Sequence, residues 1–582
     1  MISKTPHYNA KIKTILDALE PGERVCVLTG EKWFMDGEEI GWYRKFQVPP
    51  SKYAPRTRLK LINSYFVIFD IWYNRHAETG KTIISNIHPA TGIRVLPDKE
   101  WFEKDFTSHA KTFDSSHSFF DQFYELSRSV PRAAGYNYVQ PENSIAFISF
   151  GDQDSYFVLA CQSKRCFFSI NATRAEDCAE LSMVNGAQNS YNVIHSDRIY
   201  HCRFVRESYD CLHSDFLFDC RNCEYCFGAT NKRHRKYLWF NEQLSKEEWE
   251  KRFAEVDLTS YENLQKYRQK FYDLVNKAVW PENFNVNTEN CLGEYLSNVS
   301  NIQNGYYAMA AGSRDIAFSS YIIGPPSHDI YFVAAPIGSS DSYYGLGMEG
   351  CSHVRFSLSI NAKNDSCEYC ESCYDCRDCF GCVGLRKKRF CILNKQLDEE
   401  TYWKEVDKIK CAMMESREYG DIPPAKFSTQ FFMGSGAAVL YGATEEDRQK
   451  LGAAIFKPSD EGGEGPHIDP AEIYSTEDIP DFIPPSECEN VLGKPYFDKK
   501  MGRRYAYLKA ELAFYTRLKI APPRVHPTRR ILDLYQEMNM AVFEQKNCTK
   551  CQREIMVAKN RHYPNRLLYC SPCYLRFIEE NG

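Results

Sequence analysis

Two stretches of the chain, 140–240 and 290–395, are built from short apolar and aromatic runs separated by Gly, Ser, Asn and Pro. DSYFVLAC (154–161), DIYFVAAP (329–336) and DSYYGLGM (341–348) each open on an acidic residue and continue with aromatic and β-branched residues. Short strands that recur at roughly regular spacing are typical of a sandwich, a barrel or a solenoid. The pattern therefore predicts two strand-rich blocks.

A helix is expected at the end of each block. Ser245 and Glu248 form a capping-box pattern ahead of an amphipathic run, and Asp398 is the matching N-cap of the second helix. A further amphipathic run, 261–279, links the blocks. Helices in these places would cover the open ends of a β coil and prevent edge-to-edge aggregation.

Cysteines occupy every third position of SCEYCESCYDCRDCFGCVG (366–384), and a shorter version, DCRNCEYCFGA, spans 219–229. Placing Cys226 on Cys379 shifts the chain by 379 − 226 = 153 residues and brings the following Phe-Gly pairs together. The middle of the chain is therefore interpreted as duplicated. Small residues that stay in register from coil to coil favour a solenoid over the other β architectures.

Two interpretations of this cysteine ladder remain open. The thiols are either buried small hydrophobes in a β core, or ligands of a multi-metal or iron–sulfur site. Side chains along a straight strand alternate with period two, so a period of three favours a ligand role. Against that role, the first block has Ala229 where the second has Cys382. A structural role is the preferred hypothesis.

The two ends of the chain also resemble each other. Residues 39–58 align without a gap to 511–530, with Tyr43 opposite Tyr515 and Arg58 opposite Arg530. Each segment predicts a short helix that the following prolines end.

The C-terminal copy continues into Cys548-Thr-Lys-Cys551 and, after the spacer 552–569, Cys570-Ser-Pro-Cys573. Two C-x2-C knuckles at this spacing are a strong signal for one tetrahedral zinc ion, with the spacer expected to form a β-hairpin. Four thiolates leave no open coordination position, so the predicted zinc is structural.

The N-terminal copy has no such thiols. His76 and Thr79 stand at the positions of the first knuckle, and no CxxC pair follows. We therefore expect the N-terminal module to keep the shape of a zinc ribbon without its metal.

Composition narrows the remaining classes. The chain has 24 Cys and a formal net charge of −5, without a secretory signal or an apolar run long enough to span a membrane. A cytoplasmic location with reduced thiols is expected. The acidic run 458–490 lacks Lys and Arg and is expected to be a poorly ordered linker.

Basic residues gather in the two terminal modules, next to aromatic side chains. Such patches fit contact with a phosphate backbone and stacking on bases, so RNA, DNA or a ribonucleoprotein is the favoured partner. The alternative is a solvated helix face. The candidate residues are Arg44, Lys45, Arg56, Arg58, Arg503, Arg504, Arg524, Arg529 and Arg530.

No catalytic residue is predicted. No G-x-S-x-G, Walker or G-x-G-x-x-G element is present. Asp152, Asp154, Asp329 and Asp341 open strands, where they could line up as the carboxylates of a carbohydrate-active or carbohydrate-binding β-helix. Turn formation by Asp is the commoner explanation. A protein-interaction scaffold is a further alternative.

Together, CFGCVGLRKKRFCILNKQL (379–397), ELAFYTRLKIAPPRVHPTRR (511–530) and the terminal CxxC pairs resemble an uncharacterised family. This family comprises Cys-rich zinc-ribbon proteins of metagenomic bacterial genomes, often labelled CaiB/BaiF-like CoA-transferases. The resemblance covers most of the chain and implies no catalytic residues. No residue here supports the transferase label.

The sequence thus predicts a mainly β protein with α-helices. Two β-solenoid or β-helix-like blocks with capping helices are expected between two zinc-ribbon-like modules. The favoured function is a non-enzymatic scaffold or binding protein with one structural Zn²⁺. Its expected divisions are an N-terminal module (1–110), a first block (111–284), a second block (285–416), an acidic linker (417–487) and a C-terminal zinc module (488–582).

Overall fold

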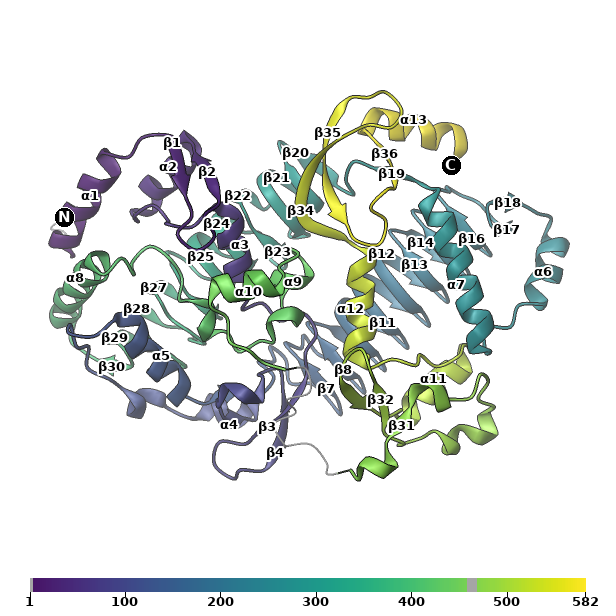
Figure 1. The fold of residues 1–582 in the computed structure, drawn as a ribbon, viewed down its shortest axis with the longest axis horizontal. Coiled ribbons are helices and arrows are strands. Elements are labelled where there is room, and N and C mark those ends of the chain that lie inside the picture. Colours follow the sequence, from purple (N-terminus) through teal and green to yellow (C-terminus); the bar gives the residue numbers. More distant parts are fainter. Residues whose placement is uncertain (1–3, 458–467) are drawn as a thin grey trace.

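The computed structural model describes residues 4–457 and 468–582. Those residues form a mixed α/β structure in which two blocks of largely parallel strands are covered by helices (Figure 1). No helix among them is long and apolar enough to cross a membrane.

In the first block, neighbouring strands pair in parallel. Partner residues such as Ala179 and Tyr191 lie 191 − 179 = 12 positions apart, and this offset holds from β10 to β17. The chain thus advances by one strand for every 12 residues. The strands along this path are β7 (Ile145–Phe147), β8 (Tyr156–Leu159), β10 (Phe167–Glu176), β11 (Ala179–Gln188), β12 (Tyr191–Tyr200), β13 (Arg203–Arg206), β15 (Asp215–Phe218), β16 (Phe227–Thr230) and β17 (Leu238–Trp239).

The second block follows the same scheme with a less regular start. Arg314 pairs with His328 at an offset of 328 − 314 = 14, whereas His328 pairs with Ser340 at an offset of 340 − 328 = 12. Its main strands are β20 (Val286–Glu289), β21 (Leu292–Ala308), β22 (Arg314–Ala317), β24 (His328–Ile337), β25 (Ser340–Glu349), β26 (Leu358–Ile360), β27 (Asp365–Glu368), β28 (Arg377–Phe380) and β29 (Arg389–Ile392).

Every third residue of these blocks points into a narrow core. From Cys166 to Ala229 the inward positions carry Cys, Ala, Val, Leu, Ile and Ser, and their side chains are almost fully buried. The residue before each inward position has a positive φ, as at Arg165, Phe168 and Asn171. These left-handed residues turn the backbone at every third position, so the inward period is three rather than two.

This geometry explains the cysteine ladder. Cys367, Cys379 and Cys391 face one another on successive parallel strands, and the ladder thiols are buried in one core cluster. A period of three therefore does not by itself favour a ligand role, because these strands turn at every third residue and are not straight.

Each terminal module packs on the block that is farther from it in the sequence. In the N-terminal module, α2 (Gly37–Phe46) and α3 (Pro55–Asn63) lie against the second block, where the rings of Trp42 and Tyr331 stack at 4.7 Å. In the C-terminal module, α12 (Pro527–Glu537) lies against β10 and β11 of the first block. Figure 1 shows the purple end of the chain over the second block, and the yellow end over the first block and beside β21 of the second.

Two further helices also cover the blocks. The chain enters the first block after α5 (Phe119–Ser129). The ring of Phe119 nevertheless lies 5.3 Å from the ring of Phe380 in the second block. Conversely, α7 (Tyr261–Asn276) precedes the second block but packs Phe271 on Phe216 of the first, at 5.7 Å. The second block is therefore covered by a helix that precedes the first block, and the first block is covered by the helix that links the two blocks.

The expected block-terminal helices are present. Ser245 caps α6 (Lys246–Ala254) by accepting a hydrogen bond from the Glu248 N–H, and Asp398 caps α8 (Glu399–Glu415) in the same way. These caps satisfy amides that the helix leaves unpaired.

The expected linker 417–487 needs correction. Residues 417–457 are largely packed into the interior and form α9 (Gly436–Val439) and α10 (Glu445–Leu451), with Ile422, Phe427 and Phe432 buried. The acidic run was expected to be poorly ordered, and its residues 458–467 lie outside the described residues.

The packing predicts unequal effects at neighbouring positions of β12. Ile199 points inward and is 1% exposed, whereas Tyr200 points outward and is 40% exposed. We expect Ile199→Ala to lower the free energy of unfolding by about 3 kcal/mol, because a narrow core cannot collapse around the missing methyl groups. Tyr200→Ala, the matched control, should cost less than about 1 kcal/mol. Equal urea midpoints for the two variants would contradict the inward assignment.

Candidate metal centre and the predicted cations

The four predicted zinc ligands lie together. Cys548 and Cys551 occupy the turn between the antiparallel strands β34 (Asn539–Asn547) and β35 (Glu554–Asn560). Cys570 is the N-cap residue of α13 (Ser571–Asn581), and Cys573 lies in its first turn. The two knuckles are joined where the Thr549 N–H donates a 2.8 Å hydrogen bond to the Leu568 carbonyl.

The sulfur geometry fits a tetrahedral metal ion. The four Sγ atoms lie within 4.8 Å of one another, and those of Cys551 and Cys570 are 3.6 Å apart. A zinc ion with four Zn–S bonds of about 2.3 Å requires S···S edges of about 3.8 Å. Within residues 4–457 and 468–582, this is the one group of His, Cys, Asp or Glu side chains close enough to share an ion.

Backbone hydrogen bonds lower the pKa of the Cys548 thiol. Burial raises the pKa of its thiol, but hydrogen bonds from the backbone N–H groups of Cys570 and Cys551 outweigh this effect and hold the pKa at about 6. Because the thiolate is the form that binds metal, these hydrogen bonds favour the ligand state of Cys548 near neutral pH, whereas burial and the neighbouring thiols raise the pKa of Cys573. A closed set of four thiolates suits a structural ion.

The spacer 552–569 does not form the expected hairpin. Its first strand, β35, pairs with β34, and its second, β36 (Leu567–Tyr569), pairs in parallel with β19 (Val279–Pro281) at the entry to the second block. The prediction failed because the partner of β36 lies almost 300 residues away in the sequence.

The N-terminal module has a hairpin in the corresponding place, formed by β3 (Trp72–Arg75) and β4 (Thr82–Ser85). His76 lies in its turn, and the Thr79 N–H donates to His76 Nδ1 at 3.3 Å. The other ring nitrogen lies 3.2 Å from a carboxylate oxygen of Glu100. The His76 ring thus has protein partners on both sides.

The ladder thiols have the character of a protein core. Cys370 Sγ donates to the carbonyl oxygens of Glu368 and Cys379, both at 3.5 Å. Burial raises the pKa of the Cys370 thiol, whereas hydrogen bonds from the Cys373 and Cys379 thiols lower that of Cys376 to about 4. Among the described residues, the ladder thiols do not form a group close enough to share an ion.

Three of the predicted nucleic-acid contacts, Arg58, Arg503 and Arg530, are buried. Arg58 is fully buried and forms an ion pair with Glu39, which also accepts a 2.6 Å hydrogen bond from Tyr43. Arg530 repeats this arrangement with Glu511, at 2.8 Å, in the C-terminal module. These two arginines therefore cannot contact a phosphate backbone in this structure.

Most of the remaining candidate cations also have partners within the chain. Lys45 forms an ion pair with Asp329, and Arg529 pairs with Asp498 at 3.0 Å. Backbone carbonyls accept from the side chains of Arg44, Arg503 and Arg524. Arg56 is exposed and Arg504 is half-buried. The predicted cations do not gather into one open basic surface.

The acids considered for carbohydrate chemistry occupy structural positions. Asp154, Asp329 and Asp341 have positive φ, a conformation that Asp and Asn tolerate better than most residues. Asp152 is buried and accepts hydrogen bonds from the hydroxyls of Ser149 and Ser163. This placement supports the turn-forming explanation.

Nothing in the sequence signals a pocket that lies between the two blocks. Its polar lining includes Asn86, Ser372 and Gln430, which come from distant parts of the chain. No spacing or motif connects these positions, and an isolated Asn or Gln gives no signal in a single sequence.

No protein-family model and no curated protein matches this chain. Among solved structures, a crystal structure titled as a "putative acetyltransferase" from Desulfovibrio desulfuricans G20 shares 8% sequence identity with it. The match covers 50% of this chain and 85% of that one, with a TM-score of 0.09. A likeness at this TM-score carries no argument about fold or function.

The buried Arg58–Glu39 pair gives a stability prediction. In Glu39→Gln the guanidinium stays buried without its carboxylate, so the free energy of unfolding should fall by about 3 kcal/mol. The matched control is Glu446→Gln, which breaks an exposed pair with Lys450 and should cost less than about 1 kcal/mol. Chemical denaturation measures both. A Glu39→Gln variant as stable as the control would contradict the structural role of the pair.

A second prediction concerns Glu294, which is fully buried under the C-terminal module and accepts a 3.1 Å hydrogen bond from Asn539. Burial raises its pKa from 4.5 to about 7. The folded state therefore binds the proton more tightly than the unfolded state, so this group makes stability fall as pH rises from about 4.5 to 7.

Glu294→Gln should remove this contribution. The stability of the native protein relative to the variant should fall by about 3 kcal/mol across that window and stay constant above it. Urea denaturation at pH 4.5, 5.5, 6.5 and 7.5 measures the difference. Parallel pH profiles would show that Glu294 does not titrate in this range.

Proposed function

We propose that this protein is a non-enzymatic, zinc-containing scaffold. Two β-solenoid-like blocks form its body, and one structural zinc ion in the C-terminal zinc ribbon holds that module in place. The observation that carries the proposal is the closed cluster of Cys548, Cys551, Cys570 and Cys573. A four-thiolate site has no position for substrate or water, so its metal contributes to folding rather than to chemistry.

The strand pairing supports the solenoid part of the proposal. Parallel partners lie 12 residues apart through most of both blocks, and small side chains fill the inward positions. The 153-residue correspondence between the blocks fits a duplication, because Phe216 and Phe227 of the first block match Tyr369 and Phe380 of the second. Both pairs lie under a covering helix, α7 or α5.

The contacts of the C-terminal module support a scaffolding role for the zinc. Through β36 it pairs with β19, and through α12 it covers the first block. Arg206 of the first block also pairs with Glu537 of α12 at 2.8 Å. Loss of the metal would therefore loosen the contact with both blocks.

Nucleic acid is not included in this proposal. Most of the cations that suggested it form ion pairs or hydrogen bonds within the chain. Binding that depends on phosphate contacts needs cations with free hydrogen-bonding capacity at the surface.

Metal analysis of the full-length protein tests the proposal. One zinc per chain is expected, because one four-thiolate group is available. The double variant Cys548→Ser/Cys570→Ser should bind at least tenfold less zinc than the native protein. It should also become sensitive to limited proteolysis within 488–582, because closing the site contributes folding energy directly.

Cys488→Ser is the matched control, because Cys488 lies in the same module but outside the thiolate group. This variant should retain its zinc and its protease resistance. Less than half a zinc per chain would contradict the structural-zinc assignment. Iron, or three or more metal ions per chain, would show that the cysteine ladder also binds metal.

A further inference from the structure

The pocket between the two blocks follows the axis of the second block. Its lining includes one outward residue from each of five successive coils, as the strand register shows. These residues are Tyr321, Ala335, Gly347, Ser359 and Ser372. Paired strands lie about 4.8 Å apart, so the four steps between the five coils span about 19 Å. The pocket is therefore a long groove.

Small side chains in the middle of this column leave the space open. Ala335, Gly347 and Ser359 have positive φ and are half-buried, with only the groove in front of them. The neighbouring column of the same coils instead carries large rings such as Phe332 and Tyr344, which are fully covered. The floor of the groove is thus lower than the rest of the outer surface of the second block.

Apolar side chains form much of the other walls. Leu159 and Ile170 come from the first block, and Phe66 comes from the segment that covers the groove. Asn171 also lines this wall, but its side chain interacts with Tyr535. Walls of this kind favour a ligand whose apolar surface replaces water.

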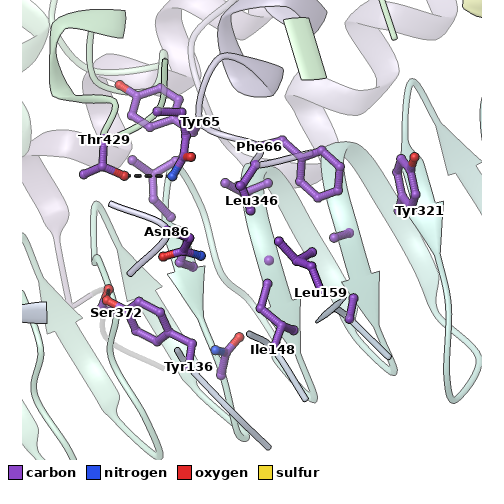
Figure 2. Close-up of a pocket in the computed structure, with 18 of the residues that line it drawn as sticks. Tyr65, Phe66, Asn86, Tyr136, Ile148, Leu159, Tyr321, Leu346, Ser372 and Thr429 are labelled. Atoms are coloured by element: carbon purple, nitrogen blue, oxygen red, sulfur yellow. Dashed lines mark hydrogen bonds between the residues drawn. The ribbon is translucent and has the colours of Figure 1, made fainter. Parts of the chain in front are cut away.

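The polarity of the groove changes along its length. At one end the hydroxyl groups of Tyr136 and Ser372 lie 3.0 Å apart. At the other end the Tyr321 hydroxyl is bonded to that of Tyr535, at 3.1 Å. Figure 2 shows Tyr136 and Ser372 at one end, Leu346 between, and Tyr321 at the far end. A matching ligand has one polar end and a long apolar part.

The polar end carries no uncompensated charge. Its charged residues, Arg132 and Glu371, form a 2.9 Å ion pair with each other. Glu371 also accepts a 2.7 Å hydrogen bond from Ser127, and Arg132 donates to the Val130 carbonyl at 2.6 Å. A charged head group would lose hydration here without gaining a counter-ion, so this end favours an uncharged group that forms hydrogen bonds.

The length of the groove matches that of one lipid chain. The hydrocarbon core of a bilayer is about 30 Å thick and contains two leaflets, so one chain spans about 15 Å. A groove of about 19 Å therefore has room for one such chain and a small head group.

We propose that this groove binds a single-chain, uncharged amphipathic lipid, such as a fatty alcohol or a monoacylglycerol. The chain lies along Ala335, Gly347 and Ser359, and the hydroxyl end lies near Tyr136 and Ser372. This site is separate from the zinc site and does not depend on the scaffold function proposed above.

Ligand competition tests the site. The uncharged fluorophore N-phenyl-1-naphthylamine is bound to the full-length, zinc-loaded protein and displaced by 1-hexanol, 1-octanol and 1-decanol. The affinity should rise about fourfold for each added methylene group, because each one buries more apolar surface. Decanoate and decyltrimethylammonium, measured at pH 7.5, should compete at least tenfold more weakly than 1-decanol.

Substitutions in the floor separate this groove from other apolar surfaces. Ala335 has a positive φ, as does Phe332, so this backbone conformation accommodates phenylalanine. Ala335→Phe should weaken the binding of 1-decanol at least tenfold, with zinc content and circular dichroism unchanged. Ala160→Phe, in the opposite wall, should have the same effect. Ala362→Phe is the matched control, because Ala362 has a positive φ and is half-buried but lies outside the groove.

Three results would overturn the proposal. They are no binding of the alcohols, an affinity that does not rise from 1-hexanol to 1-decanol, and native binding of 1-decanol in both groove variants. Equal competition by decanoate or decyltrimethylammonium would overturn the assignment of an uncharged head group.

Discussion

The structure depends on how little room each strand block encloses. With one inward side chain in every three residues and a strand spacing of about 4.8 Å, the core of a block is a narrow column. Cys, Ala, Ser and Val fit into this column, which explains why so many thiols gather there. The column is stable only where its outer faces are also covered, because aromatic residues such as Phe216 and Tyr369 point outward and need a helix over them.

The terminal modules and two helices supply those covers. The N-terminal module and α5 cover the second block, and α7 and the C-terminal module cover the first. At both junctions a buried arginine with its glutamate, Arg58 with Glu39 and Arg530 with Glu511, lies against a phenylalanine ring of the opposite block. Breaking such a buried pair is costly, so these contacts fix the position of each module. The zinc ion would act at only one of the two junctions.

Part of this organisation could be predicted from the sequence. The C-x2-C spacing located the thiolate group, and local capping patterns located α6 and α8, because both depend on residues close together in the chain. The inward period of three could not be predicted, since it depends on positive φ at residues such as Phe168 and Met183, which have no preference for that conformation. A basic run also looks the same whether its arginines are exposed or buried, as at Arg58.

The 12-residue advance per strand has a consequence for how such a chain can change its length. Removing or adding one or two residues within a regular strand would turn inward side chains outward in every later coil, and a change of three would keep them inward but misalign the strands that pair. A whole coil can be gained or lost without this effect, so lengths should change in steps of twelve. Shorter insertions are tolerated only at corners, and the two extra residues between Arg314 and His328, next to Gly324, occupy such a corner.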